Sequence, residues 1–230
     1  MTSLKSLVKK TVIGKFIQAA NRLFSNKKFP GSGTYWEEHY KAGGNSGPGS
    51  YNRLAEFKAK VINKFLEDNN VADAMEFGSG DGNNLSLVKY KKYTGLDISA
   101  SAIKHCQSKF QTDSSKGFYL YNSLAFIDTH KLFKATLTLS LDVIYHLVED
   151  DVYEKYMTDL FNASDKYVII YSRDYAEAHD FHVRSRSFSK WVADNQKSFK
   201  LIEKIDNPYK FDIIDPDNTS NAVFHFYQRS

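Results

Sequence analysis

The chain has 230 residues, is 42% hydrophobic and carries a formal net charge of +4. This length fits one domain with at most a short appendage, and the apolar content suffices for a packed core. The single cysteine, Cys106, excludes an internal disulfide framework and a cysteine-rich metal site, and we expect it to be a small buried side chain on a helix. No run approaches the roughly 18 apolar residues that a membrane-spanning helix needs.

The charge is unevenly distributed along the chain. The first 36 residues hold seven lysines and arginines and no acid, whereas the rest holds 24 basic and 27 acidic residues. Enzymes that act on nucleic acids usually carry a basic stripe across the working face. The slightly acidic body therefore predicts no nucleic-acid partner.

Apolar residues in the range 4–24 recur at spacings of three and four, with lysines between them. This pattern predicts a basic amphipathic helix, followed by a linker over residues 25–34. Such a helix can lie at a membrane interface or pack on the body or on another subunit, and both interpretations stay open. We divide the chain into an arm with its linker, 1–30, and a domain, 31–230. We expect a cytoplasmic location, with peripheral contact at the membrane face through residues 4–24 as a hypothesis.

The domain is predicted to begin with a lid or helical lead-in over residues 31–66. Residues 35–50 place three aromatic residues before four glycines, a pattern too irregular for a strand. A mobile lid over a binding cleft and an ordinary surface loop are both compatible with it. Apolar residues on one side of 53–66 then predict a helix that leads into the first strand.

A strand, a glycine turn and a second strand follow in close succession. The apolar run 71–77 ends at Gly78, Gly80 and Gly82, and such a turn lets a backbone approach a ligand closely. We expect a helix over 83–90 and then a strand that ends at Asp97. A glycine turn after one strand and a carboxylate after the next indicate the nucleoside-binding edge of a doubly wound α/β fold.

The details of the turn favour one kind of nucleoside. The dinucleotide fingerprint requires a third glycine at position 83, which is Asn83. Glu76, two residues before the first glycine, would repel a diphosphate but attract an ammonium and a sulfonium. Residues 71–82 resemble motif I of class I S-adenosylmethionine-dependent methyltransferases, and Gly95–Ser99 resembles their second motif. The resemblance implies S-adenosylmethionine as cofactor and S-adenosylhomocysteine as product.

The remaining elements fit the fold that this family has. Helices are predicted over 99–110, 151–161 and 188–195, and strands over 118–122, 135–141, 167–171, 199–205 and 222–228. Five β/α units followed by two strands match the Rossmann-like, seven-stranded class I methyltransferase sheet, with helices on both faces. The predicted fold is therefore α/β.

The resemblance implies a set of cofactor-binding residues. Asp97 corresponds to the acid that binds the ribose hydroxyls. Asn122 stands where the family often has an acid that contacts adenine, and an amide can make the same bond. The full set is Trp36, Glu76, Gly78, Ser79, Gly80, Asn84, Asp97, Ile98, Asn122, Ser123 and Leu141.

Candidate catalytic residues follow the fourth and fifth strands, because the cleft lies beyond the carboxyl ends of the strands. An oxygen acceptor must lose a proton, which a histidine or a carboxylate can accept. Asp142, His146 and His182 are the candidates, although His146 can equally be a capping or packing histidine. Tyr145, Arg173 and Arg184 are predicted to bind the acceptor.

No metal is predicted, because Asp174, His179 and His182 lack a compact ligand spacing. The segments 35–40, 43–47, 140–146 and 182–184 resemble methyltransferases of glycan assembly. That resemblance implies methyl transfer to a sugar hydroxyl, in a lipid-linked or cell-surface glycan. Two alternatives stay open, namely N- or O-methylation of a free metabolite and a binding scaffold that has lost its chemistry. A dinucleotide oxidoreductase is a more remote one. The oligomeric state cannot be predicted.

Overall fold

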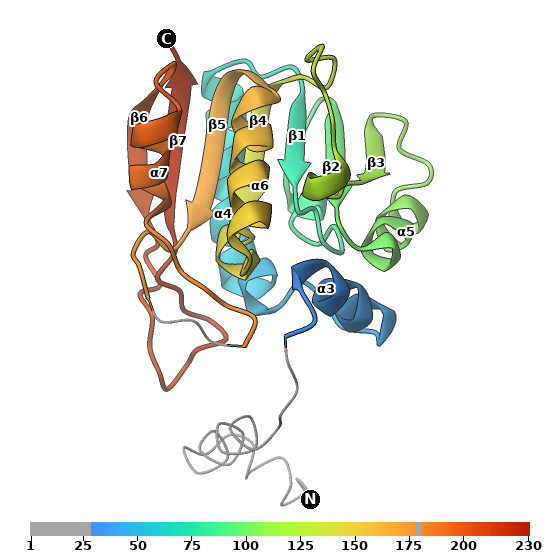
Figure 1. Cartoon of the computed structure of the whole chain (residues 1–230). Coiled ribbons are helices and arrows are strands. Elements are labelled where there is room, and N and C mark those ends of the chain that lie inside the picture. Colours follow the sequence, from blue (N-terminus) through green and yellow to red (C-terminus); the bar gives the residue numbers. More distant parts are fainter. Residues whose placement is uncertain (1–28, 178–180) are drawn as a thin grey trace, which may run out of the picture. The chain divides into compact units, whose positions relative to one another are not determined.

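A seven-stranded sheet forms the centre of the fold (Figure 1). In this computed structural model, residues 29–177 and 181–230 are described, so the predicted amphipathic helix and His179 lie outside the described residues. The strands are β1 (Ala74–Phe77), β2 (Tyr93–Asp97), β3 (Lys116–Leu120), β4 (Ala135–Leu141), β5 (Ser164–Ser172), β6 (Phe199–Asp206) and β7 (Val223–Arg229). Their order is β3-β2-β1-β4-β5-β7-β6.

The first five strands run parallel, whereas β7 is antiparallel to β5 and β6 is antiparallel to β7. This topology confirms the predicted α/β, seven-stranded fold. The strands agree with the predicted ranges to within three residues at either end. The central strands β1, β4 and β5 are largely buried, as expected for parallel strands that are covered on both faces, whereas β6 at the sheet edge is mostly exposed.

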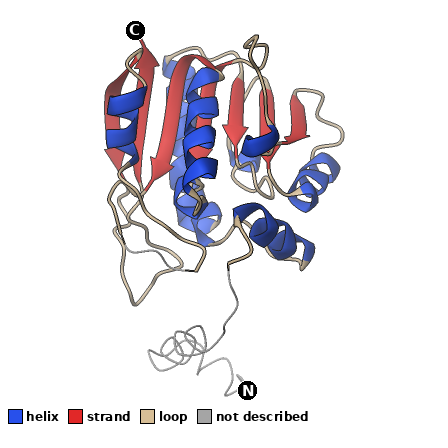
Figure 2. Ribbon diagram, viewed as in Figure 1, coloured by secondary structure: helices blue, strands red, loops and turns tan. Residues whose placement is uncertain are grey.

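Helices cover both faces of the sheet (Figure 2). The structure contains α3 (Ser32–Lys41), α4 (Asn52–Asp68), α5 (Ala100–Lys109), α6 (Asp150–Asn162) and α7 (Phe188–Asn195). On one face, α4 and α5 pack on the sheet in a cluster that includes Ile62, Phe65, Ile103, Leu139 and Phe226. On the other face, α6 and α7 contribute to a second cluster that includes Met157, Leu160, Phe188, Val192 and Tyr227. None of the helices within the described ranges is long and apolar enough to cross a membrane.

The strand order reverses between β1 and β4, which places a crevice at the carboxyl ends of these two strands. Ala74 of β1 is in register with both Tyr93 of β2 and Leu137 of β4, so the three strands end at one edge of the sheet. Helix α3 lies beyond this edge (Figure 1). The fold thus brings the segments that follow β1, β2, β4 and β5 together next to α3.

The structure corrects two predicted elements. The prediction of a helix over 83–90 is wrong, because only a single 3₁₀ turn, η2 (Leu85–Leu87), forms there. The Asn83 amide donates to the Ser50 carbonyl oxygen, and the Ser86 hydroxyl donates to the Gly82 carbonyl oxygen. Short polar side chains that bond to backbone groups in this way compete with helix formation.

The second correction concerns α3, which begins at Ser32, inside the range predicted as a linker, and ends at Lys41, inside the range 35–50 for which a lid or a surface loop was expected. The helix lacks a continuous apolar stripe, and glycines flank it on both sides. Its position instead depends on hydrogen bonds to residues that are more than 60 positions away in the sequence. Periodicity within the segment therefore gave no signal for it.

Candidate active-site cleft

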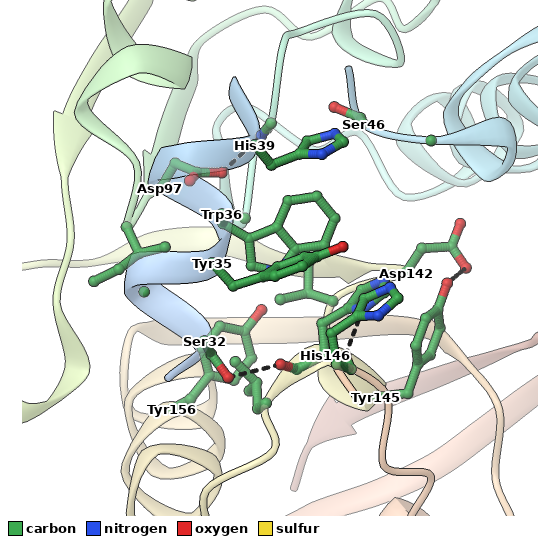
Figure 3. Close-up of a pocket in the computed structure, with 18 of the residues that line it drawn as sticks. Ser32, Tyr35, Trp36, His39, Ser46, Asp97, Asp142, Tyr145, His146 and Tyr156 are labelled. Atoms are coloured by element: carbon green, nitrogen blue, oxygen red, sulfur yellow. Dashed lines mark hydrogen bonds between the residues drawn. The ribbon is translucent and has the colours of Figure 1, made fainter. Parts of the chain in front are cut away.

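A cleft of about 580 Å³ opens at this edge of the sheet. Its lining comes from α3 and the following loop, from the glycine turn after β1, and from the segments after β2, β3, β4 and β5. Figure 3 shows Tyr35 and Trp36 of α3 lying between Asp97 on one side and His146 on the other. A cleft of this size is typical of small-molecule sites.

The glycine turn forms one wall of the cleft. Gly78 and Gly80 have φ angles of 83° and 55°, a region that L-residues with side chains rarely adopt. The N–H groups of Gly78 and Ser79 both donate to the Leu96 carbonyl oxygen, at 2.7 and 2.9 Å. A Cβ atom at Gly80 would lie 2.2 Å from the Ser46 hydroxyl oxygen. The turn therefore requires glycine for its conformation and for the close approach of the loop after α3.

Asp97 lies at the end of β2 and is buried beside this turn. Its two carboxylate oxygens accept hydrogen bonds from the N–H groups of Gly80 and Ser99, each at 2.9 Å. Burial raises the pKa of Asp97 to about 6, although these N–H groups act in the opposite direction. The carboxylate thus fixes the turn and also lines the cleft.

Two polar atoms of the lining stand out because they are buried without a partner. Ser79 Oγ and Asn84 Oδ1 have no hydrogen-bond partner within the described part of the chain. Both residues belong to the predicted cofactor set and both line the cleft. Buried polar atoms in proteins are nearly always paired, so these two indicate a place where a polar ligand binds.

Glu76 is the predicted cofactor residue whose position does not fit the prediction. It is buried within β1 and is absent from the cleft lining. The Tyr93 hydroxyl donates a hydrogen bond to it at 2.7 Å, and burial raises its pKa to about 7. The expected direct attraction between its carboxylate and a bound cation is therefore not supported. The alternation of side chains along β1 turns Glu76 toward Tyr93 instead.

Two carboxylates hold helix α3 over the cleft, one from the segment before α6 and one from α3 itself. Ser32 donates from its N–H and its hydroxyl to Glu149, at 2.7 and 2.5 Å. Glu37 accepts from the Ser99 hydroxyl and from the N–H and hydroxyl of Ser101, at 2.7 to 3.0 Å. These bonds, led by the Ser101 N–H, lower the pKa of Glu37 to about 2.

The loop after α3 is held in the same way by the glycine turn. Asp81 accepts hydrogen bonds from the Ser46 N–H at 2.9 Å and from the Tyr51 hydroxyl at 2.7 Å. The Asp81 N–H in turn donates to the Ser46 hydroxyl at 3.0 Å. We call residues 32–51 the lid. The hydrogen bonds to Glu149, Ser99, Ser101 and Asp81 hold it over the cleft.

His146 lies at the opposite end of the cleft from Asp97 and contacts rings from two other segments. Its ring stacks on His182 at 5.5 Å and meets the Trp36 ring edge-on at 4.8 Å. Its Nδ1 lies 3.2 Å from the His182 carbonyl oxygen. A carbonyl oxygen can only accept, so Nδ1 carries the proton and Nε2 of the neutral ring keeps its lone pair. Burial lowers the pKa of His146 to about 4, which keeps the ring neutral at pH 7.

Asp142 follows β4 directly and lines the cleft, with φ at 60°. Its carboxylate is not free, because Lys58 Nζ lies 2.7 Å from one oxygen and the Tyr145 hydroxyl donates to the other at 3.1 Å. The Lys58 side chain is only 1% exposed. Lys58 was not predicted, although it occupies the apolar side of α4, between Leu54 and Ile62 at helical spacing. A lysine on the apolar side of a helix was the sequence signal that could have indicated a buried charge at this position.

The structure separates the two arginines predicted to bind the acceptor. Arg173, at the end of β5, lines the cleft together with Tyr145 and His182. Arg184 does not line it, because its guanidinium donates to the Val148 carbonyl oxygen and pairs with Asp150 at 3.0 Å. Arg184 therefore fastens the segment after β5 to the start of α6, and its predicted contact with an acceptor is not supported.

The other predicted site residues all line the cleft, namely Trp36, Ile98, Asn122, Ser123 and Leu141. Asn122 is exposed there, and its side-chain oxygen accepts a hydrogen bond from the Leu124 N–H at 3.1 Å. In the described ranges, no three His, Cys, Asp or Glu side chains are grouped so as to hold a metal ion.

Comparison with solved structures relates this architecture to known proteins. The N-methyltransferase NodS from Bradyrhizobium japonicum WM9, in complex with S-adenosylhomocysteine, has a TM-score of 0.64 at 12% identity, over 86% of this chain and 98% of that one. The methyltransferase domain of bacterial CtHen1-C has a TM-score of 0.59 at 17% identity, over 77% of this chain and all of that one.

A third similar structure is the magnesium protoporphyrin IX methyltransferase ChlM from Synechocystis PCC 6803 with bound S-adenosylhomocysteine. Its TM-score is 0.58 at 12% identity, over 98% of this chain and all of that one. No protein-family model matches the sequence, and no curated protein matches it. At these identities the likeness shows a shared fold, the Rossmann-like fold of these methyltransferases.

Proposed function

We propose that this protein transfers a methyl group from S-adenosylmethionine to a hydroxyl group of a sugar. The observation that carries the proposal is the pairing of two features in one cleft. A glycine turn with Asp97 lies at one end, and a neutral histidine whose Nε2 keeps its lone pair lies at the other. The similar methyltransferase structures, two of them solved with S-adenosylhomocysteine, support the cofactor assignment.

The residues at the first end fit S-adenosylmethionine. Gly78 and Gly80 give the turn the positive φ angles that form the cleft wall, and Asp97 offers carboxylate oxygens to hydroxyl groups. Ser79 Oγ and Asn84 Oδ1, which are unpaired within the described residues, offer further polar contacts. The bound cofactor supplies an activated methyl group on a sulfonium. The protein therefore has to position an acceptor and accept its proton.

Among the candidates for that base, we assign the role to His146. Its Nδ1–H is oriented by the His182 carbonyl oxygen, which leaves Nε2 to accept a proton. Asp142 is less suited, because Lys58 and Tyr145 already occupy its two oxygens. His182 then acts through its carbonyl oxygen and its stacked ring, as a positioning residue for His146.

The rings at this end also suit a sugar. Tyr35 stacks on His182 at 4.7 Å, and Trp36 meets Tyr35 edge-on at 5.4 Å, so aromatic surface from the lid lies beside His146. The C–H faces of a sugar ring pack well on such surfaces, while its hydroxyls can reach the polar groups around them. We extend the proposal to a sugar in a lipid-linked or cell-surface glycan on the basis of the basic, amphipathic sequence of residues 4–24.

A second candidate is methylation of a nitrogen or oxygen of a free metabolite. The fold similarity to NodS, whose description is N-methyltransferase, favours keeping a nitrogen acceptor in view. A neutral His146 would accept a proton from an ammonium as well as from a hydroxyl. Vesicle sedimentation of the full chain and of a chain lacking residues 1–28 separates the candidates, because membrane binding that depends on the arm is expected only for a lipid-linked acceptor.

Calorimetry with S-adenosylhomocysteine tests the cofactor assignment. We expect the wild-type protein to bind it and not NAD, and we expect Asp97→Asn to weaken binding about tenfold or more, because charged hydrogen-bond acceptors contribute about 1.5–3 kcal/mol. Asp113→Asn, which alters a half-buried carboxylate in the turn before β3 that does not line the cleft, is the control. Binding of NAD, or unchanged affinity in Asp97→Asn, would contradict the assignment.

A further inference from the structure

We propose that the acceptor carries an anionic group, a carboxylate or a phosphate, and that Arg173 binds it. This inference rests on the proposed function, because it names the chemical class of the molecule that receives the methyl group. It is carried by the position of one guanidinium, by the commitments of the other nearby cations, and by the distribution of charge along the cleft.

Arg173 is the only lysine or arginine among the described residues that line the cleft. Its guanidinium carbon lies 5.1 Å from the centre of the Tyr145 ring, which holds the side chain beside His146. Its ion-pair partner is Glu177, at 3.8 Å, whose side chain is 54% exposed. An ion pair this long and exposed contributes little, so a ligand anion can replace it at small cost.

The neighbouring arginines are committed to the fold instead. Arg186 donates to the carbonyl oxygens of Leu147 and Val148 and pairs with Asp150 at 2.9 Å. Arg184 shares the Val148 carbonyl oxygen and Asp150. Both therefore join the segments after β4 and β5 outside the cleft. This difference singles out Arg173 from the cluster of basic residues that follows β5.

The charges along the cleft give the inference its direction. At the end near the glycine turn, Asp97 supplies a carboxylate that suits a cationic cofactor. Toward the other end, Lys58 compensates Asp142, and Glu149 is satisfied by two hydrogen bonds from Ser32. Among the described residues, the acid that pairs with Arg173 is the exposed Glu177 and not a buried one. A planar guanidinium at that place matches a carboxylate or a phosphate through two parallel hydrogen bonds.

Calorimetry on the full chain saturated with S-adenosylhomocysteine tests the proposal. The titrants are inorganic phosphate, glucose, glucuronate and glucose 6-phosphate. We expect phosphate to bind the wild-type protein and Arg173→Met to weaken that binding about tenfold or more. Arg53→Met is the matched control, because Arg53 also lies over a tyrosine ring, at 4.5 Å from Tyr209, and also pairs with a half-exposed acid, Asp215.

The titrants also separate the two sources of negative charge. Tighter binding of glucuronate than of glucose identifies a carboxylate, and tighter binding of glucose 6-phosphate identifies a phosphate. The proposal is overturned if wild-type protein binds S-adenosylhomocysteine but no phosphate, or if Arg173→Met binds phosphate as the wild type does. Failure to bind S-adenosylhomocysteine at all would instead contradict the proposed function.

Discussion

At the scale of single residues, the least expected arrangement is the Lys58–Asp142 pair between α4 and the end of β4. Asp142 has a left-handed backbone conformation, which Asp and Asn tolerate better than most residues. Its carboxylate faces a lysine that is almost fully buried. Removing one partner of such a pair leaves an uncompensated charge, whereas removing both charges does not.

We therefore expect Lys58→Met to lower the free energy of unfolding by about 3 kcal/mol. The double variant Lys58→Met/Asp142→Asn should recover most of that loss, because no buried charge is then left alone. Urea unfolding followed by circular dichroism measures both values. Equal losses in the single and the double variant would show that the pair contributes through the packing of Lys58 rather than through its charge.

His146 gives the second prediction at this scale. His146→Ala should lower kcat by about 10²- to 10⁴-fold, the usual contribution of a general base, with little change in affinity for S-adenosylhomocysteine. The exposed His105→Ala on α5 is the control. Because burial lowers the pKa of His146 to about 4, kcat at saturating S-adenosylmethionine should stay level as pH falls to about 5 and decline only as the ring gains a proton. Full turnover in His146→Ala would refute its role.

The residues that could be predicted share a simple property: each ends a strand or directly follows one. Asp97, Asp142 and Arg173 were found from such positions, since the carboxyl ends of parallel strands meet at one edge. Lys58 could not be placed so readily, because its partner is 84 residues away and only the folded sheet brings α4 beside the end of β4. The direction of the Glu76 side chain was not predicted either, because it faces Tyr93 rather than the cleft.

At the scale of elements, α3 is the part of the lid that side-chain hydrogen bonds hold in place. Glu37 ties it to the first turn of α5 through three hydrogen bonds. We expect Glu37→Ala to free this contact and to speed the release of S-adenosylhomocysteine about tenfold, because hydrogen bonds to charged groups contribute about 1.5–3 kcal/mol. Stopped-flow fluorescence of Trp36, which lines the cleft, measures the rate.

The neighbouring Glu38→Ala is the matched control for this prediction, because Glu38 is exposed on the same helix. Its release rate should equal that of the wild-type protein. If Glu37→Ala releases the ligand no faster than Glu38→Ala, then ligand release does not depend on the contact between α3 and α5.

The elements that sequence patterns predicted are those whose side chains bury a regular apolar stripe or run. Helices α4, α5, α6 and α7 agree with their predicted ranges to within two residues at either end. Helix α3 and the turn after β1 depend on side-chain hydrogen bonds instead, with Ser32 joined to Glu149 and Ser46 joined to Asp81. Bonds between distant segments leave no periodic trace, so the lid could be suspected from its glycines but its helix could not.

At the scale of the whole molecule, the site places ionisable groups where burial works against their charged forms. Burial raises the pKa of Glu76 to about 7 and of Asp97 to about 6, and lowers that of His146 to about 4. These shifts couple stability to pH in opposite directions. His146 favours the folded state as pH rises from about 4 to 6.5, while the two carboxyls favour it as pH falls.

Glu76→Gln isolates one of these contributions, because glutamine keeps the oxygen that accepts from Tyr93 and removes the ionisation. Below pH 4.5 the carboxyl is protonated in both the folded and the unfolded state. As pH rises toward 7, the unfolded chain ionises first and the folded state loses relative stability. The stability of the wild type relative to Glu76→Gln should therefore fall by about 3 kcal/mol between pH 4.5 and 7, at about 1.4 kcal/mol per pKa unit. Urea unfolding across this range measures the difference between the two proteins. The ionisation of His146 and of Asp97 contributes to both and largely cancels in that difference. If the unfolding free energies of the two proteins change in parallel with pH, then Glu76 ionises as readily in the folded protein as in the unfolded chain.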